Sequence, residues 1–187
     1  MLRPALARIL GLGLDQQPRF FFMTFPSRLR WLVLTLLIVA ADRTTKALIE
    51  SQTTEGWHYE LVRNFIYLVH SKNPGIAFSI FANSHSHFLL FGLIILSLVF
   101  ICVLAWLLLT SKSVTWRSLA GLSLLLGGAA GNLADRVIHG AVTDFFEVWF
   151  GSYRYPAFNV ADSAITVGTI LVLLDVLFPP QKVDPQK

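Results

Sequence analysis

An uninterrupted apolar window at 87–109 constrains the fold of this chain more than any other feature. It reads HFLLFGLIILSLVFICVLAWLLL and contains no Asp, Glu, Lys or Arg. A membrane-spanning helix needs about 20 predominantly apolar residues, and this window supplies them. Of the 187 residues, 55% are hydrophobic and 14% are charged, whereas soluble domains average about 25% charged residues. The chain is therefore predicted to be an integral membrane protein.

Three further windows are apolar enough to form spanning helices, although each admits a few charged residues. They lie at about 31–49, 118–136 and 160–178. Small residues in the GGAAG run at 127–131 allow neighbouring helices to approach closely, which predicts a central position for the third helix. The predicted fold class is an all-α integral membrane protein, a four-transmembrane-helix bundle.

The segment at 50–86 is too long for a simple turn between two helices. Its WHYELVRNFIYLVH stretch is rich in aromatic and β-branched residues, which favours short strands on the membrane surface. A turn is expected at SKNPGIAFS, where Asn, Pro and Gly interrupt the pattern. We therefore expect a small extracytoplasmic β-rich subdomain here, and an extracytoplasmic loop at 137–159.

Both ends of the chain are expected to lie outside a membrane domain at 28–178. Residues 1–27 are interpreted as an N-terminal cytoplasmic extension whose PRFFFM patch suits a membrane interface. Met23, just before the first window, is a candidate start residue. Residues 179–187 are interpreted as a cytoplasmic tail.

The Lys and Arg residues in the flanking segments predict the orientation. Arginines precede the first window, Lys112 and Arg117 lie between the second and third, and lysines follow the fourth. The segments 50–86 and 137–159 are poorer in basic residues. Because Lys and Arg gather on the cytoplasmic side, both termini are predicted to be cytoplasmic. The net charge of +4 is accordingly a signal of topology and not of a nucleic-acid partner.

With this orientation, the polar residues of the windows gather at one depth. A charge at the centre of a spanning helix costs about 2.5–3.5 kcal/mol, so such clustering implies mutual pairing, a watery cavity or both. Asp175 is the exception and is interpreted as an ordinary interfacial charge near the inner end. The clustered residues lie in the outer leaflet or just above it: Asp42, Lys46, Asn132, Asp135, Arg136, Asp144, Asn159 and Asp162.

Structural roles are available to most of these residues, and spacing alone leaves the choice between a structural and a functional role open. The structural alternatives are an ion pair (Asp42 with Lys46), a helix-end cap (Asp135 with Arg136), an interhelical hydrogen bond (Asn132) and N-caps of the fourth helix (Asn159, Asp162).

The single Cys102 lies within the second apolar window and is expected to be a small buried thiol.

The missing motifs narrow the function classes. The five His residues form no HExxH zinc motif, and no GxSxG element is present, so we predict no metal and no cofactor. Paired carboxylates can share a proton and activate water, which makes Asp144 and Asp162 a candidate catalytic pair. The competing hypotheses are a small transporter or channel subunit and a non-catalytic assembly factor.

Five ordered blocks then carry a resemblance to a known family. They are DRTTK at 42–46, NPGIAFS at 73–79, GNLADR at 131–136, VTDF at 142–145 and PAFNVADSAITVG at 156–168. Together they resemble the motifs of bacterial lipoprotein signal peptidase, also called signal peptidase II. One departure is Pro74, where many relatives carry a small or polar residue.

The resemblance implies a membrane aspartic endopeptidase that cleaves diacylglyceryl-modified prolipoproteins before the lipidated cysteine. The implied location is the bacterial cytoplasmic membrane, with the active site near the outer face. A monomer in contact with membrane lipids and the prolipoprotein is expected. By motif position, the implied residues are catalytic (Asp144, Asp162), substrate-binding or supporting the pair (Asn73, Asn132, Arg136, Asn159) and structural (Asp42, Lys46, Asp135).

Overall fold

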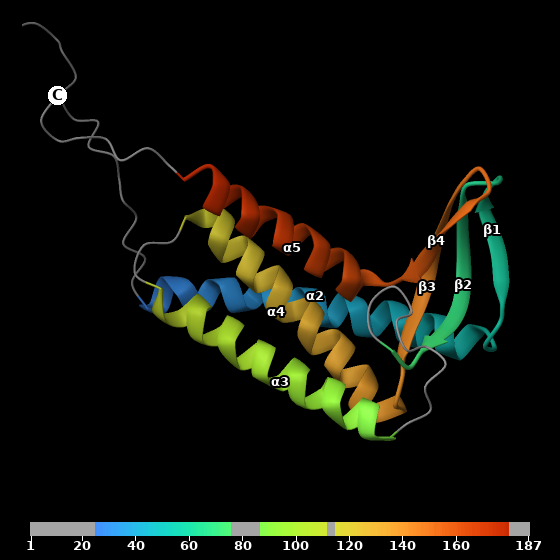
Figure 1. The fold of residues 1–187 in the computed structure, drawn as a ribbon, viewed down its shortest axis with the longest axis horizontal. Coiled ribbons are helices and arrows are strands. Elements are labelled where there is room, and N and C mark those ends of the chain that lie inside the picture. The colour runs from blue at the N-terminus through green and yellow to red at the C-terminus, as the bar shows by residue number, and fades with distance from the viewer. Residues whose placement is uncertain (1–24, 76–86, 112–114, 180–187) are drawn as a thin grey trace, which may run out of the picture.

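The computed structural model describes residues 25–75, 87–111 and 115–179 as four helices and one four-stranded sheet (Figure 1). The helices lie together, and the sheet stands at one end of the bundle. The helices are α2 (Phe25–Gln52), α3 (His87–Thr110), α4 (Trp116–His139) and α5 (Val160–Leu177), and the strands are β1 (His58–Val62), β2 (Ile66–Asn73), β3 (Val142–Phe150) and β4 (Tyr153–Phe158).

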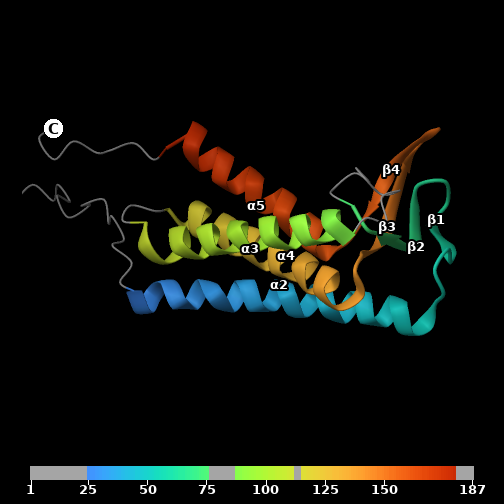
Figure 2. The same ribbon diagram turned by 60° about the horizontal axis from the view of Figure 1, so that its bottom comes forward.

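Helix α4 is the centre of the bundle, because it packs against α2, α3 and α5. It begins at the N-cap Thr115, whose side chain accepts a hydrogen bond from Ser118 N, and it ends at Gly140, which has a left-handed φ of 73°. The predicted central position of this helix is confirmed. Figure 2 shows α2 running along the whole bundle as far as the sheet.

Two glycines of α4 allow this close packing. A Cβ atom added at Gly128 would lie 2.4 Å from the carbonyl oxygen of Ala161, and one at Gly131 would lie 2.6 Å from Asp42 Oδ2. At these positions, a methyl group would push α5 or the Asp42 carboxylate away from α4.

We therefore expect Gly128→Ala to lower the free energy of unfolding by about 1–3 kcal/mol, the usual cost of overpacking. The matched control is Gly92→Ala on α3, because an added Cβ there meets nothing within 4 Å. Gly92→Ala should be neutral or slightly stabilising. Thermal unfolding in detergent measures both, and equal melting temperatures would contradict the packing argument.

The sheet is antiparallel in the order β1-β2-β3-β4. The strands expected in 50–86 are present, but the expectation that 137–159 is a loop was wrong, since β3 and β4 occupy most of it. The run VTDFFEVWF has its three polar residues at positions 143, 144 and 147 and so lacks the regular alternation that marks a half-buried strand. Its edges pair with β2 and β4, which sequence spacing does not reveal.

Two other expectations need correction. Helix α2 begins at Phe25, inside the expected N-terminal extension at 1–27, and continues to Gln52. Residues 1–24, with Met23, and the tail beyond 179 lie outside the described residues, so these interpretations stay predictions. Cys102 is exposed and not buried, because it lies on a face of α3 that packs against no other described helix.

The surface of the bundle is apolar and its interior holds charges. Exposed side chains include Phe88 at 90%, Leu36 at 66% and Val176 at 69%, whereas Asp42 and Lys46 are fully buried. Helices α3 and α5 are long and apolar enough to cross a membrane, with mean hydropathies of 3.1 and 1.9 in their most apolar windows. Soluble proteins rarely expose contiguous apolar surface of this kind, so the distribution favours helices that face lipid.

Candidate active site

Asp144 and Asp162 lie on different elements and meet around one asparagine. Asp144 is on β3 and is 3% exposed, and Asp162 is in the first turn of α5. Asn159 Nδ2 donates to Asp144 Oδ1 at 2.7 Å. The Asn159 side chain also accepts from Asp162 N at 2.9 Å, while Asp162 Oδ2 accepts from Asn159 N at 3.2 Å. The two carboxyl groups are therefore linked through Asn159.

The capping box of α5 orients the Asn159 amide. A backbone N–H can only donate, so Asn159 Oδ1 must face Asp162 N, and the amide nitrogen is left to face Asp144. The expected N-cap role of Asn159 is confirmed, and so is the capping role of Asp162 that spacing left open. Capping and a catalytic role are compatible here, because Asp162 stays partly exposed.

A buried lysine orients the second amide in the same way. Lys46 Nζ, which has only donors, contacts Asn132 Oδ1 at 3.1 Å. Asn132 Nδ2 then points at Asp162 Oδ1 and donates to it at 2.8 Å. The expected interhelical hydrogen bonds of Asn132 are confirmed, and they reach both α2 and α5.

Lys46 belongs to a buried ion cluster beneath these amides. Its ammonium lies 2.7 Å from Asp42 Oδ2, as the spacing predicted, and 2.8 Å from Asp135 Oδ2. Arg43 also pairs with Asp135. Asp135 therefore pairs with α2, and within the described part of the chain no hydrogen bond or ion pair joins its side chain to Arg136, as the cap alternative would have required. Asp42 Oδ1 accepts from Ala161 N at 2.9 Å, which attaches the cluster to the start of α5.

Asn73 and Arg136 complete the polar residues expected at the site. Asn73, the last residue of β2, donates from Nδ2 to Asp144 Oδ2 at 3.2 Å. Arg136 binds backbone oxygens, donating to Gly75 O at 2.8 Å and to Asn132 O at 3.2 Å. The Nε atom of Arg136 is buried and has no partner among the described residues. Both side chains reach the same cavity as the two aspartates.

That cavity has a volume of about 490 Å³ and a polar end and an apolar end. Its polar end is lined by the two aspartates with Asn73, Asn132 and Arg136. The remaining walls come mainly from α3, α5 and β4 and are mostly apolar, including Leu93, Leu96, Phe100, Phe158 and Ile165. An extended, largely apolar ligand could therefore present one polar segment to the carboxyl groups.

Burial raises the pKa of the Asp144 carboxyl from its ordinary value of 3.8 to about 7, and the negative charge of Asp162 acts in the same direction. Hydrogen bonds from Asn73 and Asn159 and the charge of Lys46 oppose this rise in pKa. Near neutral pH the Asp144 carboxyl is therefore protonated in about half of the molecules. A protonated Asp144 can donate a proton at the place where the Asp162 carboxylate can accept one.

The sequence suggested no role for three polar residues beside the site. Glu50, Lys72 and Thr143 form a hydrogen-bonded cluster immediately behind Asn73 and Asp144. Asp175, which we expected to be an interfacial charge near the inner end, also accepts hydrogen bonds from Thr115 and Ser118 at the start of α4. The only sequence clue to such groups was their polar character next to apolar windows.

Similar proteins agree on one family. A model of signal peptidase (SPase) II, Peptidase_A8, matches residues 34–178. The lipoprotein signal peptidase of Solibacter usitatus is 40% identical over 159 residues, covering 82% of this chain and 95% of that protein. That of Pseudomonas syringae pv. tomato is 40% identical over 150 residues, covering 80% and 86%. A solved structure of a bacterial membrane enzyme has a TM-score of 0.72 at 26% identity, covering 83% of this chain and 94% of that one. The chain belongs to the signal peptidase II family.

Proposed function

We propose that this protein is a membrane aspartic endopeptidase that removes signal peptides from lipid-modified prolipoproteins, with Asp144 and Asp162 as its catalytic pair. Family membership supports the activity and the substrate class. The observation that carries the catalytic assignment is the link between the two carboxyl groups through Asn159 at the polar end of the cavity.

In the proposed reaction, a water molecule attacks the carbonyl carbon of the scissile peptide. The ionised carboxylate of the pair takes a proton from this water, while the protonated carboxyl gives its proton to the carbonyl oxygen. When the tetrahedral intermediate collapses, the C–N bond breaks, the leaving nitrogen receives a proton from the protonated carboxyl of the pair, and one hydroxyl of the intermediate returns its proton to the carboxylate of the pair as the new carbonyl forms. The pair then holds one proton again, as it did at the start.

The surrounding side chains orient the two carboxyl groups and the substrate. Asn132 and Asn159 hold the carboxylates by hydrogen bonds whose direction is determined by Lys46 and by the start of α5. Arg136 lines the cavity with a half-buried, cationic side chain and is our candidate to position the substrate or to stabilise the developing oxyanion. We assign Asp42, Lys46 and Asp135 to the structural support of this network.

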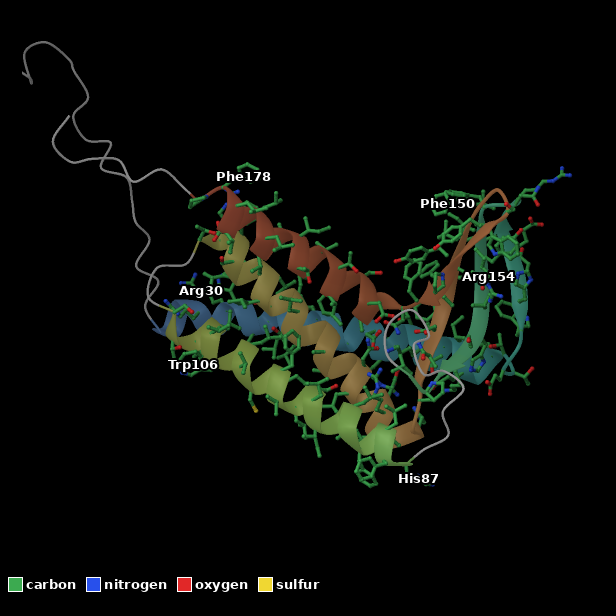
Figure 3. The ribbon with its side chains drawn as sticks, viewed as in Figure 1. Arg30, His87, Trp106, Phe150, Arg154 and Phe178 are labelled. Carbon is green, nitrogen blue, oxygen red and sulfur yellow. The ribbon has the colours of Figure 1, made fainter. Side chains whose placement is uncertain are left out.

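We further propose that all four helices span the bacterial cytoplasmic membrane, with both termini inside and the sheet at the outer face. Arg30, Trp106 and Phe178 lie at the end of the bundle away from the sheet, whereas Phe150 and Arg154 lie on the sheet (Figure 3). The buried charges of α2 and α4 allow these helices to face lipid with apolar side chains. The apolar cavity walls on α3 and α5 support entry of the substrate from the bilayer. We expect a monomer, because one chain supplies every residue of the proposed site.

The alternatives from the sequence are less well supported. Membership of a peptidase family favours an enzyme over a transporter, a channel subunit or an assembly factor. A transport pathway would also connect both ends of the bundle, whereas the cavity has its polar residues at one end.

The direct test is cleavage by the purified protein in lipid. A diacylglyceryl-modified prolipoprotein should yield a product whose first residue is the lipidated cysteine, as identified by mass spectrometry. The matched substrate lacks only the lipid and should be cleaved poorly. Equal cleavage of both forms, or cleavage at another bond, would contradict the proposed specificity.

The pKa of Asp144 predicts how the cleavage rate depends on pH. The pair needs one proton, and raising the pH through about 7 removes it from Asp144, so the rate should fall on the alkaline side. The hydrogen bond from Asn73 lowers the Asp144 pKa, so Asn73→Ala should raise that pKa and move the alkaline limb to higher pH. A profile of kcat/KM against pH measures both effects. A limb that moves to lower pH in Asn73→Ala would contradict this assignment.

A further inference from the structure

We propose that Glu50, Lys72 and Thr143 form a positioning cluster that holds Asp144 in place for catalysis. This inference rests on the proposed function, because it concerns the same reaction. None of the three side chains lines the cavity, so their effect would act through the strands that carry Asn73 and Asp144.

The three side chains bind one another. Lys72 Nζ donates to Glu50 Oε1 at 2.6 Å and to Thr143 Oγ1 at 2.7 Å. The Thr143 hydroxyl in turn donates to Glu50 Oε1. Each side chain therefore contacts both of the others, and together they join the last turn of α2 to strands β2 and β3.

The register of the sheet places this cluster directly behind the proposed site. Lys72 on β2 lies opposite Thr143 on β3. Each is followed in sequence by a residue of the site, Asn73 and Asp144 respectively. Successive side chains of a strand point to opposite faces. The cluster therefore holds one face of the strand pair against α2, while Asn73 and Asp144 meet on the other face.

Thr143 is fixed by its backbone as well as by its side chain. It is fully buried, and its N–H donates to Asp135 Oδ2 at 3.4 Å. Its carbonyl oxygen accepts from Asn159 Nδ2 at 3.3 Å, and the same amide nitrogen donates to Asp144. A displacement of Thr143 would therefore change the position of Asp144 relative to Asn159, and so relative to Asp162.

The partial exposure of the Lys72–Glu50 ion pair predicts that its loss changes the catalytic rate more than the stability of the fold. The Lys72 and Glu50 side chains are 25% and 21% exposed. Ion pairs that reach solvent contribute little to the free energy of unfolding. Catalytic rates are far more sensitive to position, since a misplacement of about 1 Å can cost about 100-fold. Loss of the cluster should therefore lower the rate more than the melting temperature.

The test compares Thr143→Val, which keeps the shape of the side chain and removes its hydroxyl, with Thr143→Ser, which keeps the hydroxyl. With lipid-modified prolipoprotein, Thr143→Val should lower kcat by about 10-fold at unchanged KM, and Thr143→Ser should stay close to the wild type. Glu50→Gln should lower kcat in the same way. The matched control is Glu60→Gln on β1. It removes the same charge from an exposed position of the same sheet and should leave kcat unchanged.

Exchanging the charges of Glu50 and Lys72 provides a second test. Recovery of kcat in such a double variant would not be seen if the single variants simply failed to fold. The double variant Glu50→Lys/Lys72→Glu can rebuild the same three contacts with donor and acceptor exchanged. It should recover most of the kcat lost in the single variant Lys72→Glu. Melting temperatures in detergent monitor folding throughout.

The positioning role is wrong if Thr143→Val has the wild-type kcat. It is also wrong if the kcat per folded molecule is unchanged while the melting temperature falls, or if charge reversal gives no recovery. Asp144→Asn, measured in parallel, separates this result from the proposed function. A fully active Asp144→Asn overturns the catalytic assignment itself, whereas an inactive Asp144→Asn beside a fully active Thr143→Val overturns only the positioning role.

Discussion

Asp144→Asn and Asp162→Asn, each made singly, are expected to lower the rate of prolipoprotein cleavage by at least about 1,000-fold. An amide has nearly the size of a carboxyl group, but it can neither take a proton from water nor return one to the leaving nitrogen. General acid–base catalysis contributes about 10²–10⁴-fold, and each variant removes half of the pair that performs it. Single-turnover cleavage of a lipid-modified prolipoprotein by the purified variants measures the loss.

The matched control is Asp175→Asn. Asp175 is another partly buried carboxylate on α5, and it accepts hydrogen bonds from Thr115 and Ser118. Its replacement should cost some stability and leave cleavage intact. Binding of the lipid-modified substrate should persist in all three variants, because Asn keeps the shape of each site. If either Asp144→Asn or Asp162→Asn processes substrate at the wild-type rate, the water-activation mechanism is wrong.

Lys46→Met is expected to destabilise the protein strongly. The Lys46 side chain is fully buried between Asp42 and Asp135, both of which are also fully buried. Its removal leaves two carboxylates close together with less positive charge to compensate them. Breaking a buried ion pair from one side costs about 3–5 kcal/mol. The variant should therefore have a lower melting temperature and a smaller folded yield in detergent.

Cleavage should also fall in the molecules of Lys46→Met that do fold. Without the ammonium, Asn132 Oδ1 keeps only the longer hydrogen bond from Asn159 Nδ2 at 3.3 Å, so the Asn132 amide is held less firmly in the orientation that donates to Asp162. Arg63→Met is the control, because Arg63 is an exposed cation on the β1–β2 connection. Addition of Asp42→Asn to Lys46→Met should recover part of the stability by removing one uncompensated charge. A melting temperature for Lys46→Met equal to that of Arg63→Met would show that the buried cluster contributes nothing.

Local patterns in the sequence predicted much of the fold. The charge-free run at 87–109 matches α3 almost residue for residue, since a helix of this kind depends only on apolar character over a sufficient length. The Asp42–Lys46 pair was predictable because residues four apart share a helix face. The N-cap at Asn159 followed from its place before an apolar window.

The predictions that failed depended on partners far away in the chain. The strand at β3 looked like part of a loop, because its partners β2 and β4 had to be paired before its edges could be recognised. One structural alternative joined Asp135 to Arg136, its neighbour in sequence, yet Asp135 pairs with Lys46 and Arg43 of α2. The Glu50–Lys72–Thr143 cluster joins three elements, and no spacing rule relates those positions.

The sequence by itself determined the family and the apolar helices, and it singled out Asp144 and Asp162 through ordered motifs. These features depend on residue type and on short-range spacing. Only the tertiary structure decided how the two carboxyl groups are brought together. Antiparallel pairing of β2 with β3 places Asn73 beside Asp144, and the capping box of α5 turns the Asn159 amide toward the same carboxylate. Both arrangements require hydrogen-bond partners from separate elements, because an amide has no preferred direction until its neighbours are in place.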